Sequence, residues 1–401
     1  TTGQLNSLAD NSSEDMSATV EDGWRLKIEN IVNVVTEACS NILKIITHGD
    51  KKHTLKKEND VLIIGDNRDQ SPLYTETLAK TIRGWQGNLG GKTEARYLPG
   101  QRPFTNIAQV DPSIPKLAGK VDVIIVTYSN PGEKIRHEES SAVNQALLKT
   151  ALDRMQDKSI RLYAVAARPT VHVLESLADT KAIDQTNKLS KQLENYLQQK
   201  AGQEMQVYTL REGKHVEPLK FNIPSRQGVS ADYFEANEAI INIPAGEVFF
   251  EPTPGTANGK LYLKEGSFYH LNVPVHGMII IKFEDGEIVE CRNLGGKDKE
   301  TYGFIMKHLE VKENKHLAEM GIGTYLAGSG IPMDEMIYNN TILEKLQGFH
   351  IAYGNSIPIK GNHEAPEHVD NWVKYGDVFV GEDHVISRGK INTKLIESKS
   401  R

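Results

Sequence analysis

Two short, unbroken apolar runs in the first half of the chain constrain its fold more than any other feature. They are Asp60-Val-Leu-Ile-Ile-Gly-Asp66 and Asp122-Val-Ile-Ile-Val-Thr127. A strand with one face in water alternates apolar and polar residues, whereas a strand of a parallel sheet is buried on both faces and is apolar throughout. These runs therefore predict two strands of a parallel sheet.

Helical patterns alternate with strands through this half. Apolar residues recur at helical spacing between Trp24 and Ile46, which predicts an amphipathic helix. Further helices are predicted at residues 73–84, 141–155 and 180–202, and further strands at residues 94–98, 161–167 and 206–210. Strands that alternate with helices indicate an α/β layer with a mostly parallel sheet.

The character of the sequence changes near residue 225. Strands are predicted after it at residues 239–243, 260–263, 277–282 and 288–291, with a final hairpin at 377–387 and helices at 299–309 and 334–346. This mixture predicts an α+β domain. We therefore divide the chain into a disordered polar segment at 1–22, an α/β N-terminal domain at 23–225 and a C-terminal domain at 226–401.

Composition narrows the functional class. The net charge of −6 gives no reason to expect nucleic acid as a partner, because phosphate binding needs clustered Lys and Arg. The two cysteines are far apart, which argues against a disulfide framework and fits a reducing compartment. No apolar run is long enough for a membrane span. These features predict a cytoplasmic enzyme.

Five residues of the last third have the chemistry of a metal centre: Glu247, Glu319, His350, His368 and Asp370. Each lies beside glycine or turn-like residues, and their oxygen and imidazole ligands suit Zn²⁺, Co²⁺, Mn²⁺ or Fe²⁺. One catalytic zinc typically takes three protein ligands. The C-terminal domain is therefore predicted to hold two divalent metal ions, which would use all five residues and share a bridging water.

Each of these residues also has a simpler interpretation. Glu247 or Glu319 alone is more often a surface carboxylate, and His350, between Phe349 and Ile351, is more often a core histidine. His363 and His384 lie near the His-x-Asp pair and compete for a ligand role. Other histidines stay unassigned, among them His270, His276 and His308.

The order of the motifs resembles the aminopeptidase T family, the thermophilic-type metallo-aminopeptidases. The matching runs are residues 244–249, 318–323, 334–337, 350–354 and 368–370, within a region of resemblance from 235 to 375. The resemblance implies an α/β N-terminal domain, a catalytic C-terminal domain and a homodimer that encloses the active site. It also implies that the five residues hold two metal ions and that small peptides lose their N-terminal residue to metal-activated water. Glu247 and Glu319 are then the candidates for general base.

Two positions depart from the family pattern. The family places a Tyr seven residues after the histidine of His-Ile-Ala, where this chain has Ile357. Tyr353 and Tyr375 are nearby but out of register. Tyr325 stands where the family commonly continues with Asn. Both departures predict an altered substrate or altered chemistry.

Two alternatives remain. The chain is also similar to the 2,5-dihydroxypyridine dioxygenases, for which His350, His368 and Asp370 would form a two-histidine, one-carboxylate Fe²⁺ site. The third possibility is a metal-binding or peptide-binding relative that has lost turnover, which the departures at Ile357 and Tyr325 suggest.

Overall fold

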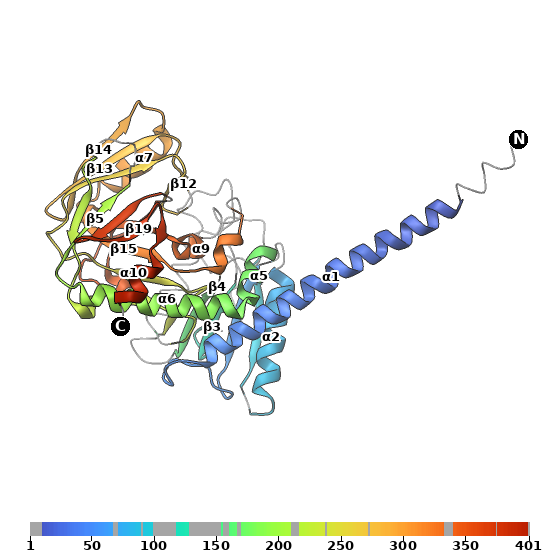
Figure 1. Ribbon diagram of the computed structural model, residues 1–401. Coiled ribbons are helices and arrows are strands. Elements are labelled where there is room, and N and C mark those ends of the chain that lie inside the picture. Colours follow the sequence, from blue (N-terminus) through green and yellow to red (C-terminus); the bar gives the residue numbers. More distant parts are fainter. Residues whose placement is uncertain are drawn as a thin grey trace, which may run out of the picture.

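The computed structural model describes most of the chain. The described residues are 10–66, 71–89, 91–98, 118–127, 154, 160–166, 170–209, 216–236, 239–271, 273–332, 340–373 and 375–399. Figure 1 shows a β-rich part, an α/β part beside it, and a first helix that projects away from both.

The apolar runs form a parallel sheet, as predicted. Across the sheet the strands are β2 (Thr93–Leu98), β1 (Val61–Asp66), β3 (Val123–Val126), β4 (Leu162–Ala166) and β8 (Ile240–Ile243). Every neighbouring pair is parallel. The apolar side chains of β1 and β3 are buried, because helices cover the sheet. The α/β fold class with a parallel sheet is confirmed.

Four helices accompany this sheet. They are α1 (Asp10–Thr47), α2 (Ser71–Gln86), α5 (Val171–Ala178) and α6 (Thr180–Gln199). The helix predicted at 24–46 lies inside α1. This helix begins within the segment predicted to be disordered, of which residues 1–9 lie outside the described residues. The helix predicted at 141–155 also falls outside them, apart from residue 154.

Antiparallel sheets dominate the second half. The largest has the order β12 (Val273–Pro274), β11 (Phe268–Tyr269), β17 (His368–Val373), β16 (Gly348–Gly354), β15 (Leu317–Gly323), β9 (Glu247–Phe250) and β7 (Ser230–Asp232). The second has the order β20 (Lys390–Ile391), β19 (Asp383–Ser387), β18 (Asp377–Val380), β5 (Glu204–Tyr208) and β6 (Leu219–Asn222). The third consists of β10 (Gly259–Lys264), β13 (Met278–Glu284) and β14 (Glu287–Leu294). Both predicted hairpins, β13–β14 and β18–β19, are present.

Short helices complete the second half. They are α7 (Lys299–His308), α9 (Asn340–Lys345) and α10 (Thr393–Lys399), with 3₁₀ turns η2 (Arg226–Gly228), η3 (Lys312–Lys315), η4 (Ala327–Gly330) and η5 (Ile357–Ile359). The Asp298 side chain caps α7. Residues 333–339, which include the start of the helix predicted at 334–346, are outside the described residues. None of the described helices combines the length and apolar composition needed to cross a lipid bilayer.

The sheets exchange strands across residue 225. β8 follows that position but is the edge strand of the parallel sheet. β5 precedes it but is antiparallel to β6 and β18, so the strand predicted at 206–210 does not extend the α/β layer. A local apolar pattern predicts a strand without its partner, because pairing depends on distant segments. The domain bounds proposed from the sequence stay a prediction.

Helix α6 connects the two hydrophobic cores of the molecule. Its Ile183 belongs to the core between the parallel sheet and its helices. Its Leu189, Leu193 and Tyr196 belong to the core among the antiparallel sheets. In Figure 1 the helix runs from α5 along the base of the β-rich part. One face of the seven-stranded sheet packs on the second core through Met320, Ile322 and Ile351, among others.

We expect Ile322→Ala to destabilise the protein strongly, because Ile322 is fully buried in central strand β15. Truncation of a buried isoleucine to alanine costs about 2–5 kcal/mol of unfolding free energy. The control is Val289→Ala, on the exposed side of β14, which is expected to change the unfolding free energy by less than about 0.5 kcal/mol. Thermal unfolding followed by circular dichroism compares the two, and equal melting temperatures would contradict this packing.

Candidate metal centre

Four neighbouring strands of the seven-stranded sheet carry the five candidate ligands. Glu247 lies on β9, Glu319 on β15, His350 on β16, and His368 with Asp370 on β17. Successive side chains of a strand point to opposite faces. Phe349 and Ile351 therefore enter the apolar core while His350 between them faces the other way. The same alternation places Glu247 opposite to buried Val248, and Glu319 opposite to Met320.

Small residues leave room for these polar side chains on their shared face. Gly321 pairs with His350 in the register of β15 and β16. A β-carbon at Gly321 would overlap the His350 ring and lie 2.5 Å from Oε1 of Glu247. At Gly246 the backbone has φ +116°, a conformation that favours glycine, and it passes close to Tyr325. Both glycines thus permit the approach of the side chains around them.

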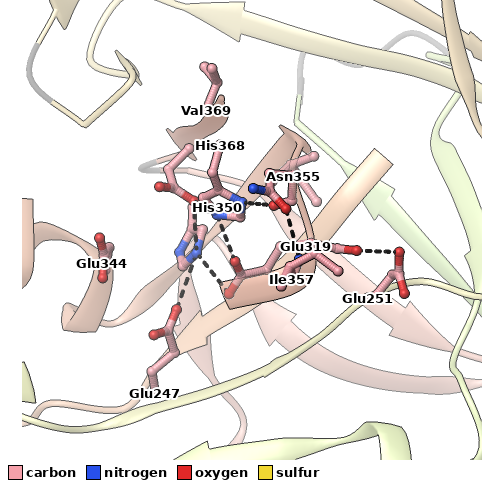
Figure 2. A network of polar contacts seen from close by, with 12 residues as sticks. Glu247, Glu251, Glu319, Glu344, His350, Asn355, Ile357, His368 and Val369 are labelled. Carbon is pink, nitrogen blue, oxygen red and sulfur yellow. Dashed lines mark hydrogen bonds and ion pairs between the residues drawn. The ribbon is translucent and has the colours of Figure 1, made fainter. Parts of the chain in front are cut away.

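The structure brings all five side chains together. Nε2 of His350 lies 3.2 Å from Oε1 of Glu247 and 3.6 Å from Oε1 of Glu319. Nε2 of His368 lies 3.0 Å from Oε2 of Glu319 and 3.1 Å from Oδ1 of Asp370. Figure 2 shows Glu247 and Glu319 pointing toward His350, with His368 beside them. Their role as metal ligands remains a prediction.

Glu319 belongs to two overlapping ligand sets. One set is Glu247, Glu319 and His350, and the other is Glu319, His368 and Asp370. Within each set the candidate ligand atoms lie within 4.8 Å of one another. Metal–ligand distances near 2 Å place two ligands of one ion up to about 4 Å apart. Each set therefore has dimensions and chemistry that fit a divalent cation after small side-chain movements.

The surroundings of two ligands also fit a metal. Nδ1 of His368 is hydrogen-bonded to the backbone carbonyl of Asn355. This bond assigns the proton to Nδ1 and turns Nε2 toward the carboxylates, as in many metal-binding histidines. Oε1 of Glu247 is buried and, among the described residues, accepts no hydrogen bond. A cation at this oxygen would satisfy it.

Without metal, the centre holds protons. Burial alone would lower the pKa of His350, but the facing carboxylates, chiefly Glu247 and Glu319, raise it to about 10. Burial is likewise outweighed at His368, where Asp370 and Glu319 raise the pKa well above its usual range. Burial would raise the pKa of Asp370, but His368 and His350 hold it well below its usual value. The two imidazoles therefore neutralise Glu319 and Asp370, whose pKa values they lower, when no metal is bound.

A buried lysine, Lys345, adjoins this centre. Lys345 is the last residue of α9, and its ammonium contacts Oε2 of Glu247. It also lies 3.1 Å from Oδ2 of Asp232 and 3.3 Å from Oε2 of Glu344. No sequence pattern predicts this role, since Glu344-Lys345 at the end of a short helix is typical of a solvated surface.

The competing histidines have other partners. Nε2 of His363 is 2.7 Å from the carbonyl oxygen of Glu313, and Nε2 of His384 is 3.0 Å from Oδ1 of Asp377. His308 contacts Tyr269 and Glu367. Among the described residues none of the three belongs to a possible ligand set.

The residues that depart from the family pattern have distinct places. Ile357, half exposed, lies on η5, two residues after the Asn355 carbonyl that orients His368. Tyr353 is three residues from His350, faces the apolar core and donates to the Tyr269 hydroxyl, so it cannot replace the missing Tyr. Tyr325 donates to the Ser176 hydroxyl at 2.7 Å and so links the seven-stranded sheet to α5.

Comparison with known proteins shows that the region carrying this centre is similar to a family of metalloproteases. Residues 179–372 match the family described as thermophilic metalloprotease (M29), which confirms the resemblance to the aminopeptidase T family. This match supports a metal-dependent peptidase. No curated protein sequence matches the chain.

Two solved structures share the fold. One is 2,5-dihydroxypyridine dioxygenase from Pseudomonas putida KT2440, with a TM-score of 0.58 and 15% identity over 92% of this chain and 98% of that one. The other is wild-type AmpT from Thermus thermophilus, with a TM-score of 0.58 and 15% identity over 89% of this chain and 99% of that one. At this identity the likeness shows the fold alone, so it does not separate the two chemistries.

We expect metal binding to release protons. His350 and His368 are protonated at neutral pH in the absence of metal, and an imidazole must be neutral to bind a cation. Because both pKa values are raised, metal affinity should increase as the pH rises from 6.5 toward about 10. Calorimetric titration with Zn²⁺ in buffers of different ionisation enthalpy measures about one proton released per histidine that binds. Heats that do not depend on the buffer would contradict the protonated state.

Proposed function

We propose that the protein is a metal-dependent aminopeptidase that releases N-terminal amino acids from small peptides. The observation that supports this most is that Glu319 belongs to both ligand sets, so two cations could share its carboxylate. The match to the thermophilic metalloprotease family over residues 179–372 supports the same reaction class.

The proposed centre uses two Zn²⁺, Co²⁺ or Mn²⁺ ions. Glu319, His368 and Asp370 would hold one ion, and Glu247, Glu319 and His350 the other. A bound divalent cation lowers the pKa of water and polarises the carbonyl of the scissile bond. Because thiolates are absent from both sets, such hard or borderline cations suit them.

The residues of this chain contribute position and proton transfer. The Asn355 carbonyl holds the His368 ring in place, and Gly321 leaves space for His350 and Glu247 to approach. Glu247 and Glu319 are the proposed catalytic carboxylates, since both are buried and belong to the ligand sets of the centre. A buried carboxylate next to a reacting water can accept its proton.

An Fe²⁺-dependent ring-cleaving dioxygenase is the second candidate. His350, His368 and Asp370 supply two imidazoles and one carboxylate, and Nε2 of His350 lies 3.6 Å from Oδ1 of Asp370. The dioxygenase from Pseudomonas putida has the same fold. The two additional buried carboxylates, Glu247 and Glu319, favour the peptidase, because a two-histidine, one-carboxylate site does not need them. A relative without turnover is the third candidate, motivated by Ile357.

The wider expectations are part of this proposal. We propose a small peptide as substrate, a homodimer as the assembly and the cytoplasm as the location. The sequence-based expectation that neither nucleic acid nor a membrane is a partner stays a prediction.

We expect a chelator to abolish peptidase activity and Glu319→Gln to abolish it without unfolding the protein. Glutamine keeps the size of Glu319 but removes the charge that both ligand sets share. Hydrolysis of aminoacyl amides is measured after metal stripping and controlled reloading, and circular dichroism reports folding. Glu310→Gln, on an exposed glutamate, is the matched control and should keep full activity. Full turnover in Glu319→Gln would exclude Glu319 as a ligand.

We expect Ile357→Tyr to raise kcat on aminoacyl amides with less effect on KM. A tyrosine hydroxyl beside the centre would stabilise charge that develops on the substrate oxygen, and the loss of one such donor costs about 10² to 10³ in turnover. Ile357→Phe is the matched control, because it adds the ring without the hydroxyl. If Phe and Tyr change specificity alike and neither raises kcat, Ile357 only lines the substrate pocket.

A further inference from the structure

Lys345 places a permanent positive charge inside the candidate metal centre. Its side chain is only 2% exposed, and its ammonium contacts Oε2 of Glu247, whose other oxygen, Oε1, lies 3.2 Å from Nε2 of His350. Both oxygens of Glu247 are thus next to positively charged or proton-bearing nitrogen. The charge of Lys345 therefore lies next to the ligand set of Glu247, Glu319 and His350.

Among the described residues, no lysine forms an ion pair with the other ligand set, Glu319, His368 and Asp370. The described ion pairs of Lys345 are with Glu247, Asp232 and Glu344, and none is with Glu319, His368 or Asp370. The groups that pair with Asp370 are His368 and His350, which lose their protons when they bind metal, and His270 also acts on this carboxylate. The two sets are therefore unequal in charge before any metal binds.

Lys345 cannot move aside easily. Asp232 lies on β7 and Glu344 on α9, and both carboxylates hold the ammonium within 3.3 Å. The backbone carbonyl of Lys345 also accepts a hydrogen bond from the amide of Tyr325 at 2.8 Å. Withdrawal of the ammonium would remove a shared counter-ion from three carboxylates, which is costly in a buried site.

We propose that Lys345 is an internal cation that makes the two metal sites unequal. The chain binds one divalent ion tightly at Glu319, His368 and Asp370. A second ion at Glu247, Glu319 and His350 binds weakly, because Lys345 already neutralises Glu247 and repels the incoming charge. This inference rests on the proposed metal centre and specifies how that centre fills.

The weaker binding of the second ion follows from the position of the Lys345 ammonium beside Glu247. A divalent ion ligated by Glu247 would stand within a few ångströms of an ammonium, and the attraction of Glu247 would be divided between the two. In a buried site such repulsion is weakly screened by salt. The second site should therefore bind at least about a hundredfold more weakly than the first.

The test is the metal content of the purified, full-length protein. Wild type, Lys345→Met and the control Lys299→Met are loaded with excess Co²⁺ and dialysed, and elemental analysis counts the retained ions. Methionine keeps the length of Lys345 without its charge, whereas Lys299 is exposed and remote in sequence from the ligands. We expect about one ion per chain in wild type and in the control, and about two in Lys345→Met.

A second variant keeps the inference testable if Lys345→Met fails to fold. Calorimetric titration of metal-stripped wild type with Co²⁺ should show a tight and a weak step, and Glu247→Gln should retain the tight step and lose the weak one. Two tight ions in wild type, or one in folded Lys345→Met, would overturn the inference and leave the proposed peptidase standing. Failure of wild type to bind any metal would overturn the proposed function itself.

Discussion

The structure depends on the compensation of buried charge between four adjacent strands. Glu247, Glu319 and Asp370 are carboxylates removed from water, and an uncompensated charge in that position would be strongly unfavourable. His350, His368 and Lys345 compensate them in the absence of metal. A divalent ion can replace the protons of the histidines, but it cannot replace the ammonium without moving α9. The groups that neutralise the buried carboxylates in the absence of metal therefore also set the charge that an incoming ion meets.

The strands that carry these charged residues have one polar face and one apolar face. The opposite face of the same strands is apolar apart from buried Asn371 and packs on the core among the antiparallel sheets. On the polar face Gly321 and Ala352 leave room for the ligands, while Trp372 extends the apolar contact toward the α/β part. Tyr325 and α6 connect the two parts, so the position of the ligands is linked to the packing of the N-terminal helices.

The fold alone does not choose the reaction. A dioxygenase and AmpT are equally similar to the chain by TM-score, at 0.58 each. Function in such a fold is decided by particular side chains. Here the two additional buried glutamates favour the proposed hydrolysis, while Ile357 departs from the family pattern and Lys345 pairs with Glu247.

The sequence by itself determined the local elements and the ligand chemistry. The apolar runs predicted β1 and β3, and the residue types of the five candidate ligands predicted a metal centre. The strands that carry these ligands, β9, β15, β16 and β17, were not among the predicted strands. Only the tertiary structure decided that β8 joins the parallel sheet and that β5 leaves it, because strand pairing is made by distant segments. It also decided the place of Lys345. A lysine at the end of a short helix is indistinguishable in sequence from a solvated one until three carboxylates from β7, β9 and α9 surround it.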